Sequence, residues 1–398
     1  MRKFLLLILK FCVFLRETLA DPELLNVQVI FRHGARTPTV RFKAAIVPRE
    51  YEKKPIGALT TRGLRQQYET GLKLKSRYID KYRLVSKSFN QYETLVLSAM
   101  DDRCLQSAVA NMAGFFSNPE LGEDWPFNWM PVPIHTGTYP DRIFEPGQGC
   151  PRYTQTKDER TQLPAFKEFE EQYQEIITDF VANTGEKWRS LFELNPFVDA
   201  MVCAKEHNLT FPDWLTLERL TEARWALNKN FDYRWGHELN GERNELVVAL
   251  RAGPMLKALI SNFTQNSTHK YTAYSAHDST LLAVLTALGK RTQYDILEND
   301  WPDYAATMVF ELWKMDDGQL RVKFLYSYNS VDPKFHDFTN TIDGCPDEGM
   351  CPVKNIIMSL KKFIPKNMDM ACAVKDQKGM LKKTLHEPRR VPHIQVFE

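Results

Sequence analysis

The sequence predicts an α/β fold: a three-layer, mostly parallel sheet with helices on both faces, plus an inserted, mainly α-helical cap domain. At residues 25–31, 94–99 and 271–276 a short apolar run ends in a polar, charged tip, and a helical pattern follows. Between residues 127 and 240 strand signals become rare while aromatic, proline and charged residues are frequent. The first pattern is typical of a parallel sheet that binds ligands beyond the carboxyl ends of its strands, and the second of a separate helical lobe.

The first twenty residues have the order of features of a secretory signal peptide. A basic start precedes an apolar run from Phe4 to Leu15, and the small residues Thr18 and Ala20 follow at the spacing that signal peptidase requires. A buried N-terminal helix is the alternative interpretation. We expect residues 1–20 to be removed and the mature chain to begin near Asp21.

The predicted mature chain is almost neutral. The first twenty residues hold four basic residues and one acidic residue, so their removal changes the formal charge from +2 to −1. A neutral chain has no global field that attracts nucleic acid or an anionic membrane. No later stretch reaches the roughly 18 apolar residues of a membrane span. We therefore expect a soluble protein, secreted or lysosomal, without nucleic-acid partners.

Helical patterns follow the three predicted strands in turn. Residues 60–82 place apolar side chains at helical spacing, with one of two threonines at their start as the N-cap. A helical pattern also follows the second strand as far as Phe116. After the third strand, Ser279 is a candidate cap and Gly289 ends the helix.

These elements divide the chain after the signal segment into two parts. We predict a discontinuous catalytic core of residues 21–126 and 241–398, and a cap of residues 127–240. Within the cap, residues 163–181 have a helical pattern. Residues 307–328 predict a β-hairpin that turns at an Asp-Asp-Gly sequence.

The three strand tips carry the side chains that are candidates for catalysis and anion binding. They are Arg32, His33 and Arg36, then Arg103, then His277 and Asp278. Because the carboxyl ends of parallel strands meet at one edge of a sheet, these side chains are expected in one pocket. Three guanidinium groups form a good cradle for a phosphate dianion. Gly34 is expected to let the backbone approach the anion.

Each of these residues also has a purely structural interpretation. A histidine that follows a strand, such as His33, is often a satisfied core residue. Arg103 could pair with Asp101 or Asp102, and the sequence SAHDST could be no more than a helix cap. The remaining histidines show no spacing typical of metal ligands, so we predict neither a metal nor another cofactor.

Two motifs resemble those of a known family. The sequence FRHGARTP resembles the RHGxRxP signature of the histidine phosphatases, and the Ala-His-Asp sequence at 276–278 resembles the second signature of their acid phosphatase branch. The sequence DDRC at 101–104 falls where that family has its third phosphate-binding arginine. The resemblance covers most of residues 25–375.

The resemblance implies a role for each matching position. His33 would be the nucleophile that becomes a phosphohistidine, and Asp278 the general acid. The phosphoryl oxygens would be held by four side chains, those of Arg32, Arg36, Arg103 and His277. Neighbouring arginines fit this chemistry, because they keep an imidazole neutral and therefore nucleophilic.

The predicted function is a secreted or lysosomal acid phosphatase that hydrolyses phosphate monoesters, small molecules or phosphorylated peptides, through a phosphohistidine. A phosphomutase of the same superfamily is disfavoured because it would be cytosolic and use a glutamate as the acid. A phytase-like or lysophosphatidate-type phosphatase stays open, and so does a catalytically weak secreted phospho-ligand-binding protein or allergen. A homodimer is expected by analogy alone.

Cysteines and glycosylation sequons agree with secretion. Six cysteines follow the signal segment, and an even number favours three disulfides over a metal site, because no paired CxxC accompanies them. The spacing of two of them predicts a local bridge, and the other pairings are a guess that the sequence does not decide: Cys345–Cys351, Cys104–Cys203 and Cys150–Cys372. The candidate glycosylation sites are Asn208, Asn262 and Asn266.

Overall fold

The computed structural model describes residues 22–40, 42, 55–125, 127–237, 242–264, 269–289, 292–297, 301–375 and 381–382. The predicted signal peptide, residues 1–20, lies outside the described residues, and so does the sequon residue Asn266.

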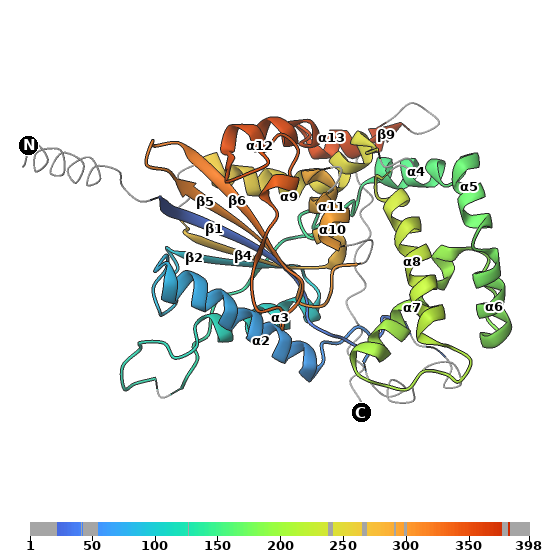
Figure 1. Ribbon diagram of the computed structural model, residues 1–398, viewed down its shortest axis with the longest axis horizontal. Coiled ribbons are helices and arrows are strands. Elements are labelled where there is room, and N and C mark those ends of the chain that lie inside the picture. The colour runs from blue at the N-terminus through green and yellow to red at the C-terminus, as the bar shows by residue number, and fades with distance from the viewer. Residues whose placement is uncertain are drawn as a thin grey trace, which may run out of the picture.

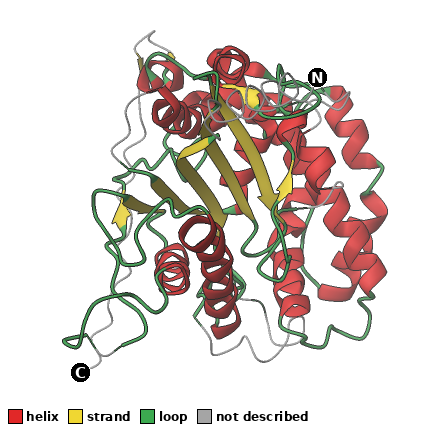
Figure 2. Ribbon diagram, turned by 60° about the vertical axis from the view of Figure 1, so that its left-hand side comes forward, coloured by secondary structure: helices red, strands yellow, loops and turns green. Residues whose placement is uncertain are grey.

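A mixed sheet lies at the centre of the molecule (Figures 1 and 2). Its strands follow the order β3-β2-β4-β1-β5-β6-β7, and β8 pairs with β6. They are β1 (Glu23–Arg32), β2 (Thr94–Ser98), β3 (His135–Thr136), β4 (Tyr271–Ala276), β5 (Thr307–Lys314), β6 (Leu320–Ser327), β7 (His336–Asp337) and β8 (Cys351–Pro352). The predicted α/β fold is confirmed, and the three strands expected to end at the site are β1, β2 and β4.

Only one half of the sheet is parallel. Strands β3, β2, β4 and β1 pair in parallel, whereas β5 pairs antiparallel with both β1 and β6. The β5–β6 hairpin is the one predicted at residues 307–328, and its turn is closed by the N–H of Met315, which donates to Gln319 O at 2.9 Å. A tight hairpin returns the chain antiparallel, because a parallel return needs a long crossover.

Helices cover both faces of the sheet, as predicted (Figure 1). One face packs against α2 (Thr61–Lys75) and α3 (Asp102–Phe115), and the other against α9 (Glu245–Thr264), α10 (Asp278–Leu288) and α12 (Val353–Leu360). The side chains of β1 alternate between the two faces of the sheet. Val29 and Phe31 pack in the hydrophobic cluster with α2 and α3, and Ile30 packs in the cluster with α9, α10 and α12. A strand buried on both faces reads as a continuous apolar run, which is why the sequence predicted it.

Two predicted helix starts can be compared with the structure. The helix predicted at 60–82 is α2 followed by a π-helix, Ser76–Lys81, and the side chain of Thr60 accepts a hydrogen bond from the N–H of Gly63. Helix α10 begins two residues earlier than expected, at Asp278, with His277 rather than Ser279 as the N-cap. The N–H of His277 donates to Thr280 Oγ1 at 3.3 Å, so the threonine takes part in the cap.

Four helices pack around a hydrophobic cluster of their own, apart from the sheet (Figure 1). We call them the helical lobe: α5 (Pro164–Glu171), α6 (Gln174–Thr184), α7 (Leu191–Glu206) and α8 (Leu217–Arg234). The helix predicted at 163–181 is interrupted between α5 and α6. Helix α4 (Pro151–Arg160) precedes the lobe, and β3 lies in the central sheet. The domain boundaries at residues 127 and 240 stay a prediction.

The remaining elements are short. They are α11 (Thr292–Leu297), η3 (Thr339–Thr341), η4 (Lys361–Phe363), α13 (Met368–Cys372), β9 (Val374–Lys375) and β10 (Leu381–Lys382). Among the described helices, α9 is long and apolar enough to cross a membrane, but 56% of its apolar window is buried inside the protein. Since α9 packs against the sheet, its apolar character is that of a core helix.

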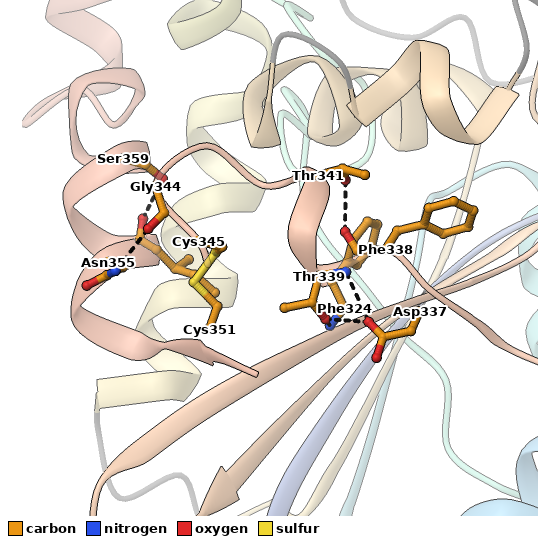
Figure 3. The surroundings of a disulfide bond; sticks show 11 residues. Phe324, Asp337, Phe338, Thr339, Thr341, Gly344, Cys345, Cys351, Asn355 and Ser359 are labelled. Carbon is orange, nitrogen blue, oxygen red and sulfur yellow. Dashed lines mark hydrogen bonds between the residues drawn. A yellow bond between two sulfur atoms is a disulfide. The ribbon is translucent and has the colours of Figure 1, made fainter. Parts of the chain in front are cut away.

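Two of the three predicted disulfides form. Cys345–Cys351 closes a turn before α12, where Asn355 donates to Gly344 O at 2.9 Å (Figure 3). Cys150–Cys372 joins the start of α4 to α13. Both pairings are confirmed.

The predicted bridge between Cys104 and Cys203 is wrong, because both are free, buried thiols. The sulfur of Cys104 lies against β4, 3.5 Å from Ala276 O. The sulfur of Cys203, on α7, lies 3.3 Å from the hydroxyl of Tyr304. Each thiol therefore has its own buried surroundings, and the even number of cysteines was a misleading signal.

The two described sequons differ in their surroundings. Asn208 follows α7 and is exposed. The side-chain nitrogen of Asn262 donates to Gln28 Oε1 at 2.9 Å, and Gln28 is buried. A glycan on that nitrogen would have to leave this contact, so Asn208 is the more accessible candidate.

Candidate active site

The end of β1 and the loop after it carry the first part of the site. The N–H of His33 donates to Ala276 O at 3.0 Å, so the tip of β1 is fastened to the tip of β4. A side chain at Gly34 would place its Cβ 2.2 Å from Gly63 O in α2. The packing of this loop on α2 therefore requires a glycine here, and the approach of its backbone to the anion stays a prediction.

All six predicted site residues meet at the carboxyl edge of the parallel strands. Arg32 Nη2 lies 2.7 Å from Asp278 Oδ2. The rings of His33 and His277 are 5.6 Å apart between centroids. Arg103 Nη2 lies 3.3 Å from His277 Nδ1, and Arg103 Nη1 is 3.2 Å from Asp101 Oδ1. Arg103 thus pairs with Asp101, as a purely structural role would predict, and it also contacts His277 in the site.

The three guanidinium groups retain unused donors. The Nε atoms of Arg32, Arg36 and Arg103 are buried and have no hydrogen-bond partner among the residues that the structure describes. A buried donor without a partner costs free energy, more so on a charged group. Three such donors around His33 suit an anionic ligand that would satisfy them.

His33 is arranged as a neutral nucleophile. Burial, together with the positive charges of Arg32, Arg103 and Arg36, lowers the pKa of His33 well below its ordinary value. Its Nδ1 lies 2.9 Å from Gly34 O, and a carbonyl oxygen only accepts hydrogen bonds. Nδ1 therefore carries the proton, and the lone pair of Nε2 is free to attack.

Asp278 is ionised in the unliganded site. Burial would raise its pKa, but Arg32, a hydrogen bond from Trp301, and Arg36 and His277 bring the pKa of Asp278 down to about 2. A bound dianion would engage Arg32 and add negative charge, and both changes raise the pKa of this carboxyl. Proton donation by Asp278 therefore depends on an occupied cradle.

Sequence reasoning missed the contribution of the helical lobe. Asp199 of α7 holds Arg36 through two hydrogen bonds, of 3.0 Å to Nη1 and 2.9 Å to Nη2. Cys203, one turn further along α7, lies 3.6 Å from Arg36 Nη1. Tyr304, in the loop before β5, packs under Arg32, whose Cζ is 4.2 Å from the ring centroid. No local motif marks these residues, because they meet the site only through tertiary packing.

A cavity of about 290 Å³ adjoins the cradle, between the core and the lobe. Its walls combine the edge of the cradle with aliphatic, aromatic and polar side chains. They are Arg32, Arg36, Thr39, Asn195, Val198, Asp199, Val202, Arg224, Leu227, Asn228, Phe231, Trp235, Asp278, Ser279 and Trp301. The rings of Phe231, Trp235 and Trp301 lie 4.8 to 5.4 Å apart and form its aromatic side.

One group of side chains could hold a metal ion. Asp101, Glu145 and His277 present one ligand atom each, all within 4.8 Å of one another. His277 Nε2 lies 3.0 Å from Glu145 Oε1 and 3.3 Å from Asp101 Oδ2, which are hydrogen-bond distances. Arg103 adds a positive charge at 3.2 Å from Asp101, so ion pairing accounts for this group without a metal.

The comparison with protein families decides the relationship of the chain. The model described as "Histidine phosphatase superfamily (branch 2)" matches residues 23–327. The chain belongs to this family. The resemblance seen in the two sequence motifs is thus confirmed, and the match covers all six predicted site residues.

Individual relatives extend the similarity over most of the chain. The chain is 29% identical over 371 residues to "Lysosomal acid phosphatase" of Rattus norvegicus, covering 92% of this chain and 84% of the relative. It is 26% identical over 384 residues to "Prostatic acid phosphatase" of Bos taurus, covering 95% of each. Both agree with the predicted enzyme class, and the chain is a phosphatase of this family.

Solved structures show the same fold at lower identity. The phytase from Citrobacter braakii superposes with a TM-score of 0.65 at 16% identity, covering 89% of this chain and 100% of that one. Hafnia alvei phytase in complex with myo-inositol hexakis sulphate superposes with a TM-score of 0.63 at 15% identity, with coverages of 89% and 99%. At these identities the likeness concerns the fold alone.

Proposed function

We propose that this phosphatase is an acid phosphatase that hydrolyses phosphate monoesters through a phosphohistidine at His33. The observation that carries the proposal is the neutral, Nδ1-protonated imidazole of His33 among three guanidinium groups with unused buried donors. Phosphoryl transfer needs positioning and compensation of negative charge more than covalent chemistry by the protein.

The reaction follows from the placement of the groups. Arg32, Arg36, Arg103 and His277 hold the phosphoryl oxygens. Nε2 of His33 attacks phosphorus, and the bond from phosphorus to the ester oxygen breaks. Asp278 gives its proton to the departing oxygen.

The second half-reaction restores the enzyme. A water molecule attacks the phosphohistidine and loses a proton to Asp278, while the bond between phosphorus and Nε2 breaks. Inorganic phosphate leaves, and His33 is neutral again. Protons and charges balance over the two steps without a further reactant.

The adjoining cavity bears on the choice of substrate. Beyond the cradle, the described residues of its lining include one further cationic side chain, Arg224, next to the aromatic rings and aliphatic groups. A phytase-like activity would require many cations for a polyphosphorylated ring. The lining therefore favours monoesters with a carbon-based, partly apolar leaving group. A binding protein without activity is disfavoured, because all six predicted site residues are present.

We also propose a secreted or lysosomal location. The order of features in residues 1–20, the two disulfides and the exposed sequon at Asn208 support it. The names of the relatives, lysosomal and prostatic acid phosphatases, point in the same direction.

The test is to trap the intermediate. Purified protein is mixed with a ³²P-labelled monoester near pH 5 in excess EDTA, quenched and denatured. We expect label on the protein that is stable in base and released by acid, as phosphorus on a histidine nitrogen is. Label that is absent, or that stays when His33 is replaced by alanine, would exclude His33 as nucleophile. Activity that vanishes in EDTA and returns with Mg²⁺ or Zn²⁺ would show that the arginine cradle is insufficient.

A further inference from the structure

His277 contacts two carboxylates that belong to neither phosphatase motif. Its Nε2 lies 3.0 Å from Glu145 Oε1 and 3.3 Å from Asp101 Oδ2. Ionised carboxylates only accept hydrogen bonds, so Nε2 carries a proton. We call Asp101 and Glu145 the carboxylate pair.

The other ring nitrogen faces the cradle. Nδ1 of His277 lies 3.3 Å from Nη2 of Arg103, which can only donate, so a neutral ring would accept this hydrogen bond at Nδ1. In a charged ring both nitrogens are donors, and one phosphoryl oxygen can accept from both Nδ1 and Arg103 Nη2. Nδ1 donates only if it is protonated. Because Nε2 already has its proton, donation from both nitrogens requires the ring to be an imidazolium.

The surroundings of the ring would oppose that charge without the carboxylate pair. His277 is 5% exposed, and burial disfavours a charged imidazole. The charged and titratable groups that face it are Arg103, Cys104, His33, Asp278 and the carboxylate pair. Burial lowers the pKa of His277, but Cys104, Asp101 and Glu145 outweigh it and hold this pKa well above the ordinary value.

The fold fixes Glu145 relative to the ring. The preceding residue, Phe144, is buried in the core, and its carbonyl oxygen accepts from Thr280 Oγ1 at 2.5 Å. The same hydroxyl oxygen accepts from the N–H of His277 at 3.3 Å. One threonine thus ties the loop that carries Glu145 to the backbone of His277.

We propose that Asp101 and Glu145 are positioning residues for His277: they keep its ring doubly protonated, with Nε2–H on the carboxylates and Nδ1–H aimed at the phosphoryl group. The proposal rests on the proposed function for the identity of the anion. It adds that the pH range of phosphate binding is set outside the two motifs, by the carboxylate pair.

The two carboxylates differ in their value for a test. Asp101 also accepts a hydrogen bond from Arg103, so its replacement disturbs a second member of the cradle. The side-chain contact of Glu145 described in the structure is with His277. Glu145→Gln is therefore the cleaner variant, because it keeps the shape of the side chain and removes its charge.

The experiment measures the affinity of sulfate by calorimetry between pH 5 and pH 8. Sulfate is a tetrahedral dianion whose charge stays constant over this range, so a change of affinity with pH reports on the protein. We expect Glu145→Gln to bind sulfate nearly as well as the wild type at pH 5 and progressively more weakly as the pH rises toward 8, because the variant ring loses its proton at a lower pH; the loss approaches about tenfold per unit of pKa shift once the pH exceeds both pKa values. Glu145→Asp keeps the charge and should lie nearer the wild type.

The control is Glu245→Gln, which removes the same charge from a carboxylate that pairs with Lys362, and its curve should coincide with that of the wild type. A Glu145→Gln curve that coincides with the wild type, or that lies below it by a constant factor at every pH, would overturn the proposal. If Glu145→Gln does not fold, Asp101→Asn is measured against the same criterion. Wild-type protein that does not bind sulfate at any pH would instead contradict the proposed anion cradle.

Discussion

The carboxyl edge of the parallel strands and the helical lobe contribute to one pocket by different means. The edge supplies six side chains from three strand tips, each within a short contiguous sequence. The lobe supplies Asp199 and Cys203 from α7, a helix of which half the residues are buried. The groups that we propose to act on the phosphoryl group thus stand at the edge of the sheet, while the lobe contacts them through Arg36.

Replacing His33, at the edge of the sheet, should cause the largest loss of activity. We expect His33→Ala to reduce activity by about 10³-fold or more while the protein still folds, because a covalent nucleophile is lost. The measurement is kcat/KM for p-nitrophenyl phosphate with circular dichroism as a check of folding. His135→Ala, at an exposed position on β3, is the control and should keep full activity. Activity above a tenth of wild type in His33→Ala would refute the assignment.

The second prediction separates proton donation from positioning on the same edge. Asp278→Asn should slow hydrolysis of glycerol phosphate by about 10²-fold or more and that of p-nitrophenyl phosphate much less, since an alkoxide needs a proton and p-nitrophenolate does not. The comparison is kcat/KM for both esters across pH. Equal losses for the two leaving groups would leave Asp278 only a positioning role.

Asp278 also predicts a dependence of stability on pH. Its pKa is lowered from 3.8 to about 2 in the fold, so ionised Asp278 stabilises the native state above about pH 4, and this contribution is lost as the pH falls toward 2. Wild type should exceed Asp278→Asn by about 2 kcal/mol in the free energy of unfolding at pH 5. Urea denaturation at pH 5 and at pH 2.5 tests this. A difference in unfolding free energy between wild type and Asp278→Asn that is as large at pH 2.5 as at pH 5 would contradict this prediction.

Replacing Asp199 in the lobe should have a smaller effect than the replacements at the sheet edge, and it should strengthen phosphate binding rather than weaken it. Asp199→Asn removes the charge that holds Arg36, so we expect phosphate to inhibit several-fold more tightly, and the free energy of unfolding to fall by about 1–3 kcal/mol. Asp179→Asn is the matched control, because Asp179 pairs with Arg219 at the surface of the lobe, where such pairs contribute about 0–1 kcal/mol. Phosphate inhibition that weakens in Asp199→Asn would mean that Asp199 assists anion binding.

The last prediction concerns the thiols that the two regions keep apart. Native protein should react with no thiol reagent, because Cys104 and Cys203 are both buried. Denatured without reductant, the chain from residue 21 onward should release two thiols per molecule, since its other four cysteines are in disulfides. A count of zero would restore the third bridge.

The strand tips were accessible to sequence reasoning for a physical reason. A buried parallel strand is apolar along its whole length, so the charged residues after Phe31, Met100 and Ala276 stand out as the points where the chain leaves the core. Local signals also marked the start of α2 and the β5–β6 hairpin. These features depend on neighbours in the chain.

The cysteines show where such reasoning ends. The bridge Cys345–Cys351 spans a separation of six residues, and the spacing alone suggested it. Pairing Cys104 with Cys203 required knowledge of which elements lie together, and the fold gives each sulfur a different neighbour. The number of cysteines limits how many bridges can form, but it does not show which sulfur atoms lie close together in the fold.

The sequence by itself therefore determined the fold class and the three strand tips, and it indicated the six predicted site residues, because each depends on apolar periodicity or on side chains a few positions apart. Tertiary structure alone decided that Asp199 holds Arg36 and that Asp101 and Glu145 hold His277. Glu145 and His277 are far apart in the chain, and neither the loop nor the strand tip has a pattern that points to the other. Their contact arises from the packing of Phe144 and Thr280, which brings the two segments together only in the folded core.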